Sequence, residues 1–287
     1  MKYGVMVSTF GEFADPRAMA TLARETEVAG WDGIFTWDHI ATATSPRGQR
    51  AAAEPLLDTW VALTIVAMNT QRISFGPRVT PLPRRRPWKL ARETVSLDHL
   101  SGGRLILGVG SGFPEIVEAE FGRFDEPTDP RIRAEQLDEG LDVLGGLWSG
   151  RPFSFHGRHY QVDDVTFLPT PVQSPRIPVW VAGTWPSKAP MRRAARWDGV
   201  CIPQADGSLT PDQLRAAVAY IEEYRGGMQS FDVTWAGFTP GDDPRVGASK
   251  VSPYVEAGLT WWIESLSPQR GSLEEMRRRV QQGPPRR

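Results

Sequence analysis

The sequence of 287 residues contains a single cysteine, Cys201, which excludes an intramolecular disulfide and a cysteine-rich metal cluster. It also lacks an excess of either charge, because 33 Lys and Arg residues balance 34 Asp and Glu residues and leave a formal net charge of −1. A strong basic field is therefore absent, which argues against nucleic acid or a membrane surface as partners. No apolar run approaches the ~18 residues of a membrane span, and the N-terminus turns polar after Val7, unlike a signal peptide. We expect a cytoplasmic, globular protein that acts on a small organic substrate.

Several catalytic signatures are also missing. The sequence has no Walker loop, Gly-x-Ser-x-Gly elbow or His-Glu-x-x-His motif. His156 and His159 lie three positions apart without a local acidic or sulfur ligand, so no zinc or other metal site is predicted. His99 lies near a predicted helix end and is interpreted as a structural contact, and Cys201 as a small buried hydrophobe.

Short apolar runs alternate with segments of helical periodicity along the chain. Each run is continuous, as expected for parallel strands that are covered on both faces. Eight strands that each precede a helix favour an α/β fold, a (β/α)8 TIM barrel in one domain of residues 1–287, with an open doubly wound sheet as the alternative. The runs are 3–7, 33–37, 73–76, 105–109, 178–182, 199–202, 231–235 and 259–263.

Apolar spacing of three and four residues predicts the intervening helices, at 15–26, 60–68, 90–101, 137–148, 210–224 and 273–280. Another helix is expected to follow the turn at 182–187. Residues 151–170 break the alternation, because Gly157 and alternating aromatic and aliphatic residues are typical of paired strands. We therefore predict a hairpin-like insertion, within residues 151–177, between the fourth helix and the fifth strand.

Active sites of such barrels lie at the carboxyl ends of the strands. Asp38 and His39 follow the second strand, and a histidine beside an aspartate can act as a proton carrier. The alternative is that His39 only caps or packs. After the third strand, the consecutive arginines 84–86 fit an anionic cofactor tail, although they also suit a solvated basic loop.

Glycines follow the fourth and fifth strands. Gly108, Gly110, Ser111 and Gly112 would allow close approach of a ligand and offer an anion-binding nest. This is not a dinucleotide fingerprint, because Phe113 occupies the position of its last glycine. The second turn, Gly183, Thr184 and Trp185, precedes a helix and suits either a phosphate or an ordinary βα connection.

Together these segments resemble the luciferase-like monooxygenase family, including its deazaflavin-dependent branch. The resemblance rests mainly on residues 91–112, with their Ser-Gly-Gly-Arg turn and Gly-Val-Gly-Ser-Gly strand end, and on residues 178–183. It implies a barrel that binds FMN or coenzyme F420, an 8-hydroxy-5-deazaflavin, at its mouth. By that likeness the ribityl or phosphate region would be held by Gly110, Ser111 and Gly112, and the phosphate end by Gly183, Thr184 and Trp185.

The resemblance also assigns roles near the second and third strands. Trp37-Asp38-His39 matches the deazaflavin branch, in which Asp38 would contact the ring edge and His39 would donate a proton or fix the substrate. A non-proline cis peptide of that branch aligns with Arg78 and Val79, behind the ring. One departure is Phe113, where some deazaflavin dehydrogenases have a glutamate, with Glu115 as a possible substitute.

The first hypothesis is therefore hydride transfer between F420 or FMN and a small organic substrate, with His39 handling a proton. With FMN, reduced flavin and oxygen would instead make the protein a monooxygenase. A hydrolase that uses Asp38 and Glu264 and a non-catalytic flavin carrier are further alternatives. The sequence also permits a homodimer.

Overall fold

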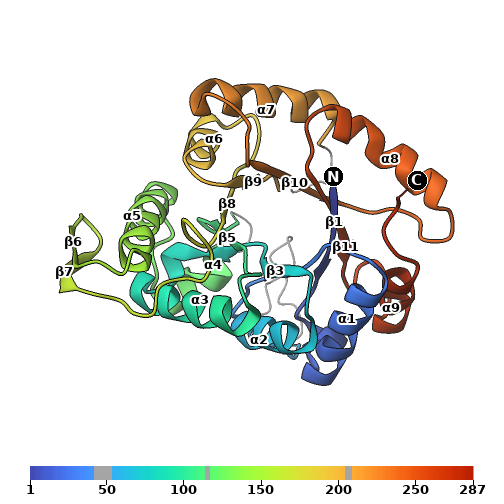
Figure 1. The fold of residues 1–287 in the computed structure, drawn as a ribbon, viewed down its shortest axis with the longest axis horizontal. Coiled ribbons are helices and arrows are strands. Elements are labelled where there is room, and N and C mark those ends of the chain that lie inside the picture. The colour runs from blue at the N-terminus through green and yellow to red at the C-terminus, as the bar shows by residue number, and fades with distance from the viewer. Residues whose placement is uncertain (42–53, 114–116, 204–208, 287) are drawn as a thin grey trace.

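The computed structural model describes residues 1–41, 54–113, 117–203 and 209–286. Its main sheet is parallel and has nine strand segments in the order β3-β2-β1-β11-β10-β9-β8-β5-β4. The strands lie at the centre of the molecule and the helices surround them (Figure 1). The bounds are β1 (Lys2–Val7), β2 (Gly33–Thr36), β3 (Ser74–Pro77), β4 (Thr80–Pro81), β5 (Leu107–Gly110), β8 (Val179–Ala182), β9 (Gly199–Cys201), β10 (Asp232–Gly237) and β11 (Trp261–Leu266).

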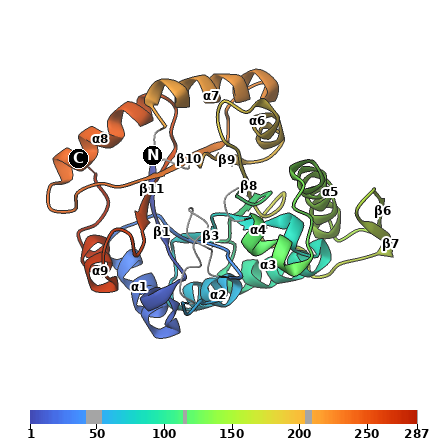
Figure 2. The ribbon, with the colours of Figure 1, turned by 180° about the vertical axis from the view of Figure 1, so that it is seen from behind.

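Helices connect the strands and form the outer layer, which is also seen from behind (Figure 2). Local signals set their ends: Asp15 accepts a hydrogen bond from the Arg17 amide at the start of α1, and Gly102 ends α3 with φ of 67°. No helix of the described residues combines the length and apolar character needed to cross a bilayer. The helices are η1 (Gly11–Ala14), α1 (Pro16–Val28), α2 (Thr59–Asn69), η2 (Leu82–Arg84), α3 (Pro87–Ser101), α4 (Val117–Glu120), η4 (Gly122–Phe124), α5 (Pro130–Trp148), α6 (Lys188–Ala195), α7 (Pro211–Arg225), α8 (Pro244–Glu256) and α9 (Leu273–Gln281).

The third barrel strand consists of two segments, and it closes the sheet. β3 pairs with β2, whereas β4 pairs with β5. An isolated parallel bridge between Phe75 and Leu105 joins β3 directly to the chain that enters β5. The nine segments therefore form the eight strands of the predicted TIM barrel, and all eight predicted strand positions are confirmed.

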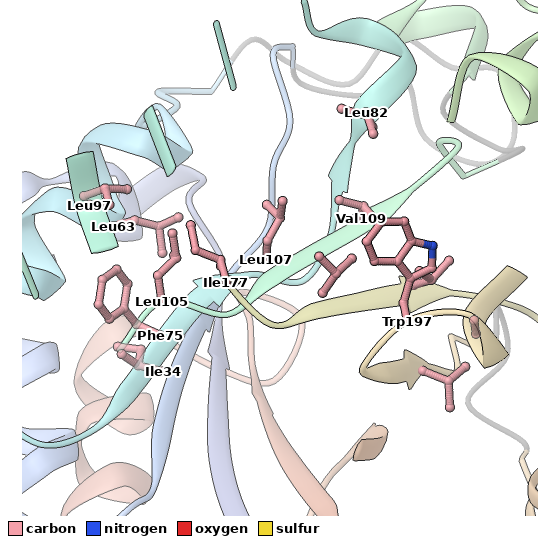
Figure 3. Close-up of a cluster of buried hydrophobic side chains, with 14 of the residues drawn as sticks. Ile34, Leu63, Phe75, Leu82, Leu97, Leu105, Leu107, Val109, Ile177 and Trp197 are labelled. Atoms are coloured by element: carbon pink, nitrogen blue, oxygen red, sulfur yellow. The ribbon is translucent and has the colours of Figure 1, made fainter. Parts of the chain in front are cut away.

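Two apolar layers stabilise this arrangement. The outer layer lies between the barrel wall and the helices, where Leu63 of α2 and Leu97 of α3 lie beside Ile34, Phe75 and Leu105 (Figure 3). The inner layer fills the barrel interior with aromatic and aliphatic side chains. Its fully or largely buried members are Met6, Phe35, Ile106, Trp180, Cys201, Trp261 and Ile263.

The hairpin insertion was predicted from the sequence, whereas one helix was not. β6 (Phe153–His156) and β7 (Gln161–Val165) form the expected antiparallel hairpin between α5 and β8, and it projects from the barrel (Figure 1). Helix α8, between β10 and β11, was not predicted. Its sequence contains Gly247 and Pro253, which interrupt helical periodicity, and tertiary packing overrides their low helix propensity.

Candidate active site

His39 lies just beyond β2 and contacts a carboxylate from a distant part of the chain. Its Nδ1 atom is 2.6 Å from Oε1 of Glu120, the last residue of α4. The Glu120 side chain is fully buried, whereas that of His39 keeps 20% of its surface exposed. An ionised Glu120 requires Nδ1 to carry the hydrogen, which leaves Nε2 as the nitrogen that can exchange a proton.

Asp38 is buried and its carboxylate is fully engaged. Arg85 donates to both carboxylate oxygens, with Nη2 at 2.7 Å from each, and the Thr80 hydroxyl donates as well. Arg84 adds a hydrogen bond of 3.1 Å to Oδ1. Asp38 therefore anchors the loop after β4. The expected contact of Asp38 with a coenzyme ring stays a prediction.

Arg84 connects the two acidic groups. Its Nη2 atom binds Asp38, and its Nη1 atom donates to Glu120. A continuous chain of charged groups therefore runs from Asp38 through Arg84 and Glu120 to His39. From the sequence, Arg84 and Arg85 were expected either to bind an anionic cofactor tail or to belong to a solvated basic loop, whereas the structure pairs them with carboxylates of the chain. Glu120 was not predicted, because it comes from another connection, 81 positions from His39.

The glycine segment after β5 borders the same mouth. At Gly110, a Cβ atom would lie 3.0 Å from Cγ2 of Val79 and 3.2 Å from Cβ of Ala182. Val79 and Ala182 are both only partly buried and pack against the inner layer. The missing side chain therefore allows Val79 and Ala182 to pack closely against β5, where they form an apolar surface.

Arg133 of α5 binds the backbone of Ser111 and Gly112, the two residues that follow Gly110. Its Nη1 atom donates to the carbonyl oxygens of Ser111 and Gly112, and burial lowers the pKa of its guanidinium. Gly112 has φ of 92°, and a Cβ there would lie 2.9 Å from both Arg133 and Phe121. The backbone amides of Ser111 and Gly112 donate to no other residue of the described chain, so they are available to an anionic ligand.

Two further predicted positions lie in the barrel wall. The peptide bond between Arg78 and Val79 is cis, as the resemblance implied. At Gly108, a Cβ would lie 2.2 Å from the Pro77 carbonyl oxygen, so this glycine permits close approach of β3 and β5. Its role in the structure is strand packing.

The turn after β8 was predicted to bind a phosphate through Gly183, Thr184 and Trp185. The Gly183 amide donates to the Cys201 carbonyl at 2.9 Å, so it is not free for a ligand. A Cβ at Gly183 would also lie 2.6 Å from Cε of Met191, which gives this glycine a role in packing α6. The amides of Thr184 and Trp185 donate to no other described residue, and a phosphate site here would depend on them.

These residues fit a coenzyme with a flat ring and an anionic tail. The partly exposed apolar side chains of Val79 and Ala182 suit the face of a ring, and the unpartnered amides of Ser111 and Gly112 suit oxygen acceptors. The hydrolase alternative fits less well. Glu264, like Asp38, is fully engaged: it binds Arg270, the Thr239 amide and hydroxyl, and Trp262 Nε1, so neither carboxylate is available as a nucleophile or acid. Glu115, the possible substitute for the glutamate that some deazaflavin dehydrogenases have at the position of Phe113, lies outside the described residues.

Comparisons with known proteins identify the family of this chain. The family model described as luciferase-like monooxygenase matches residues 1–257. An uncharacterized protein of Mycobacterium tuberculosis is 32% identical over 215 residues, which cover 71% of this chain and 70% of that protein. An F420-dependent glucose-6-phosphate dehydrogenase of Intrasporangium calvum is 31% identical over 207 residues, 71% of this chain and 59% of the relative.

Solved structures share the fold at lower identity. An F420-dependent secondary alcohol dehydrogenase in complex with an F420-acetone adduct has a TM-score of 0.79 and 15% identity, covering 99% of this chain and 98% of that one. The F420-dependent tetrahydromethanopterin reductase of Methanopyrus kandleri has a TM-score of 0.77 and 18% identity, covering 98% and 96%. The chain belongs to the luciferase-like monooxygenase family, and it is an oxidoreductase that uses a flavin or deazaflavin coenzyme.

Proposed function

We propose that this protein is an F420-dependent dehydrogenase or reductase that acts on a small organic substrate with an alcohol or carbonyl group. The observation that carries the proposal is the contact of His39 with the buried carboxylate of Glu120 beside the glycine segment. Phe121, the neighbour of Glu120, lies where a Cβ on Gly112 would meet it, so the histidine and the glycine segment border the same mouth. A proton carrier and a ring-binding surface are the two parts that such a reaction requires.

Each residue then has a definite task in the oxidation of an alcohol. The coenzyme supplies the hydride acceptor. The substrate loses a hydride from carbon and a proton from its hydroxyl group, and Nε2 of His39 accepts that proton. Glu120 orients the imidazole ring of His39 through Nδ1 and stabilises the protonated imidazole, and Arg84 holds Glu120 in place. In the reverse direction the protonated His39 returns the proton to the carbonyl oxygen.

Two observations favour F420 over FMN. Trp37-Asp38-His39 has the form that the deazaflavin branch shows at this position. Two relatives, of 31% and 30% identity, are also F420-dependent dehydrogenases, although the chain spans only 59% and 56% of their length. F420 reacts poorly with oxygen, so its use favours hydride transfer over oxygenation.

The first experiment is titration of the purified protein with F420 and with FMN, followed by tryptophan fluorescence, since the chain has 11 tryptophans. We expect strong quenching and tighter binding with F420. Tighter FMN binding with oxygen uptake would make the protein a monooxygenase instead, and binding of neither coenzyme would refute the proposal.

A second experiment separates an enzyme from a coenzyme carrier. Once a substrate is found by screening alcohols and carbonyl compounds, His39→Gln is expected to lower kcat by about 100-fold or more, which is the usual contribution of a general acid or base. Its F420 affinity should stay within about twofold of the wild-type value, because ring binding is assigned to other residues. Unchanged turnover would show that His39 does not carry the proton.

A further inference from the structure

Arg78 carries a buried positive charge inside the barrel, and none of the acidic residues that the structure describes pairs with it. Its guanidinium contacts the Thr234 hydroxyl at 3.3 Å, the Thr234 carbonyl oxygen at 3.4 Å and Met6 Sδ at 3.8 Å. All three partners are neutral. Among the described residues Arg78 forms no ion pair, although only 9% of its surface is exposed.

The surroundings of Arg78 make this charge costly in the free protein. The interior next to it is formed by the apolar inner layer, in which Phe35, Trp180 and Trp261 are fully buried. A buried ion normally has a counter-charge, because desolvation of an unpaired one costs several kcal/mol. Burial lowers the pKa of the Arg78 guanidinium, as expected in such an environment.

No neighbouring group among the described residues supplies that counter-charge. The Cys201 thiol lies next to Arg78, but burial raises its pKa, so it remains a neutral thiol. The carboxylates of Asp38 and Glu264 are bound by other arginines. Within the part of the chain that the structure describes, Arg78 is therefore left without a counter-charge, which an anionic ligand would supply.

We propose that Arg78 stabilises the negative charge that the coenzyme ring gains on reduction, and thereby raises the reduction potential of the bound coenzyme. This inference rests on the proposed function. A hydride brings two electrons and one proton, so a ring that receives it without a second proton gains one negative charge. The substrate loses the hydride, and the proton of its hydroxyl group goes to His39 rather than to the ring.

The position of Arg78 supports the coenzyme rather than the substrate as the source of this charge. Arg78 is joined directly to Val79, and Cγ2 of Val79 would touch a Cβ at Gly110. Val79 packs against Gly110 and is part of the apolar surface to which the ring is assigned. A cation placed beneath such a ring favours its anionic form over its neutral form.

The test compares Arg78→Met, which keeps the length of the side chain and removes the charge, with Arg78→Lys, which keeps a charge. The dissociation constants of oxidised and reduced F420 are measured anaerobically by tryptophan fluorescence. For Arg78→Met we expect binding of the reduced form to weaken by about 10-fold or more, while binding of the oxidised form changes less than threefold. A 10-fold change in this ratio lowers the potential of the two-electron couple by about 30 mV. Arg78→Lys should lie closer to the wild type.

Thermal unfolding of the coenzyme-free proteins provides an independent readout. Because Arg78→Met removes an uncompensated buried charge, its Tm should equal or exceed that of the wild type. A clearly lower Tm, or an equal loss of affinity for both redox forms, would show that Arg78 maintains the shape of the site and would overturn the proposal. An unchanged ratio of the two constants would overturn it as well.

The proposed function and this inference fail in different ways. If the wild-type protein binds neither redox form of F420 or FMN, the proposed function fails first. A different result would refute only the inference. In that case the wild type binds coenzyme and Arg78→Met leaves the ratio of the two dissociation constants unchanged, but a small carboxylate such as benzoate no longer competes with the substrate. The negative charge that Arg78 binds would then belong to a substrate.

Discussion

Nδ1 of His39 lies 2.6 Å from Oε1 of Glu120, although 81 positions of sequence separate them. The pair is completed by Arg84, which links Glu120 to Asp38. Three loops at the barrel mouth are therefore joined by charged hydrogen bonds, and the orientation of the histidine depends on residues in two other connections. This relationship leads to the first prediction.

Glu120→Gln removes the negative charge beside His39 and keeps the size of the side chain. We expect kcat to fall by about 100-fold with little change in coenzyme affinity, because a neutral amide no longer stabilises the protonated imidazole. Steady-state kinetics and coenzyme titration measure the two effects. Glu139→Gln is the control, since that carboxylate binds the amides of residues 158–160 at the hairpin, and its kcat should match the wild type.

Gly110→Ala tests the apolar surface at the mouth. Its Cβ would lie 3.0 Å from Val79 and 3.2 Å from Ala182, closer than ordinary contact, so it would displace the side chains to which the ring is assigned. We expect coenzyme affinity to fall by about 10-fold and stability by about 1 kcal/mol.

The matched control is Gly145→Ala in the interior of α5, where a Cβ meets nothing within 4 Å. There the substitution should stabilise the protein by about 0.5–1 kcal/mol and leave coenzyme binding unchanged, because alanine lowers the entropy of the unfolded chain. Equal coenzyme affinity in both variants would contradict the assignment of Gly110.

The lowered pKa of Glu27 predicts that part of the free energy of unfolding is lost in acid. Desolvation raises the pKa of this carboxyl group, but hydrogen bonds from the amides of Arg72, Gln71 and Ile73 outweigh it, and the net pKa is lowered from 4.5. An acid with a depressed folded-state pKa contributes stability above its unfolded-state value, and this contribution is lost as the pH falls through the folded-state value.

Glu27→Gln should therefore lower the free energy of unfolding at pH 7 by at most about 1 kcal/mol, since the group is near the surface. The difference from the wild type should disappear as the pH falls below 4.5, the ordinary value. Urea unfolding at several pH values measures this, with the exposed Glu223→Gln as the control. A difference that grows in acid would refute the prediction.

Cys201 should be unreactive in the folded protein. It is 1% exposed, and burial raises the pKa of its thiol, so little thiolate is available to a reagent. We expect the aromatic disulfide DTNB to react on the order of 100-fold more slowly with the native protein than with the unfolded chain. Because the chain has one cysteine, the absorbance change reports this site alone. Rapid labelling under native conditions would show that the barrel interior opens.

Much of the fold followed from local patterns. Continuous apolar runs and helical spacing correctly placed all eight barrel strands and the β6–β7 hairpin, because backbone hydrogen bonding and burial on both faces impose these patterns directly. Helix α8 was not predicted, because Gly247 and Pro253 weaken its helical periodicity. Tertiary packing compensates for the low helix propensity of these two residues. The glycine positions of the mouth were likewise visible, because close approach of strands excludes a side chain.

What the sequence determined by itself was the barrel and the strand ends at which a coenzyme site is expected. The tertiary structure alone decided which charges meet. It pairs Asp38 with Arg85 and Glu120 with His39, and it gives Arg78 no acidic partner within the described part of the chain. Strand and helix periodicities are properties of neighbouring residues, whereas these pairings join positions far apart in the sequence. Only closure of the barrel brings those positions together, and at buried sites the presence or absence of a partner decides what a charge can do.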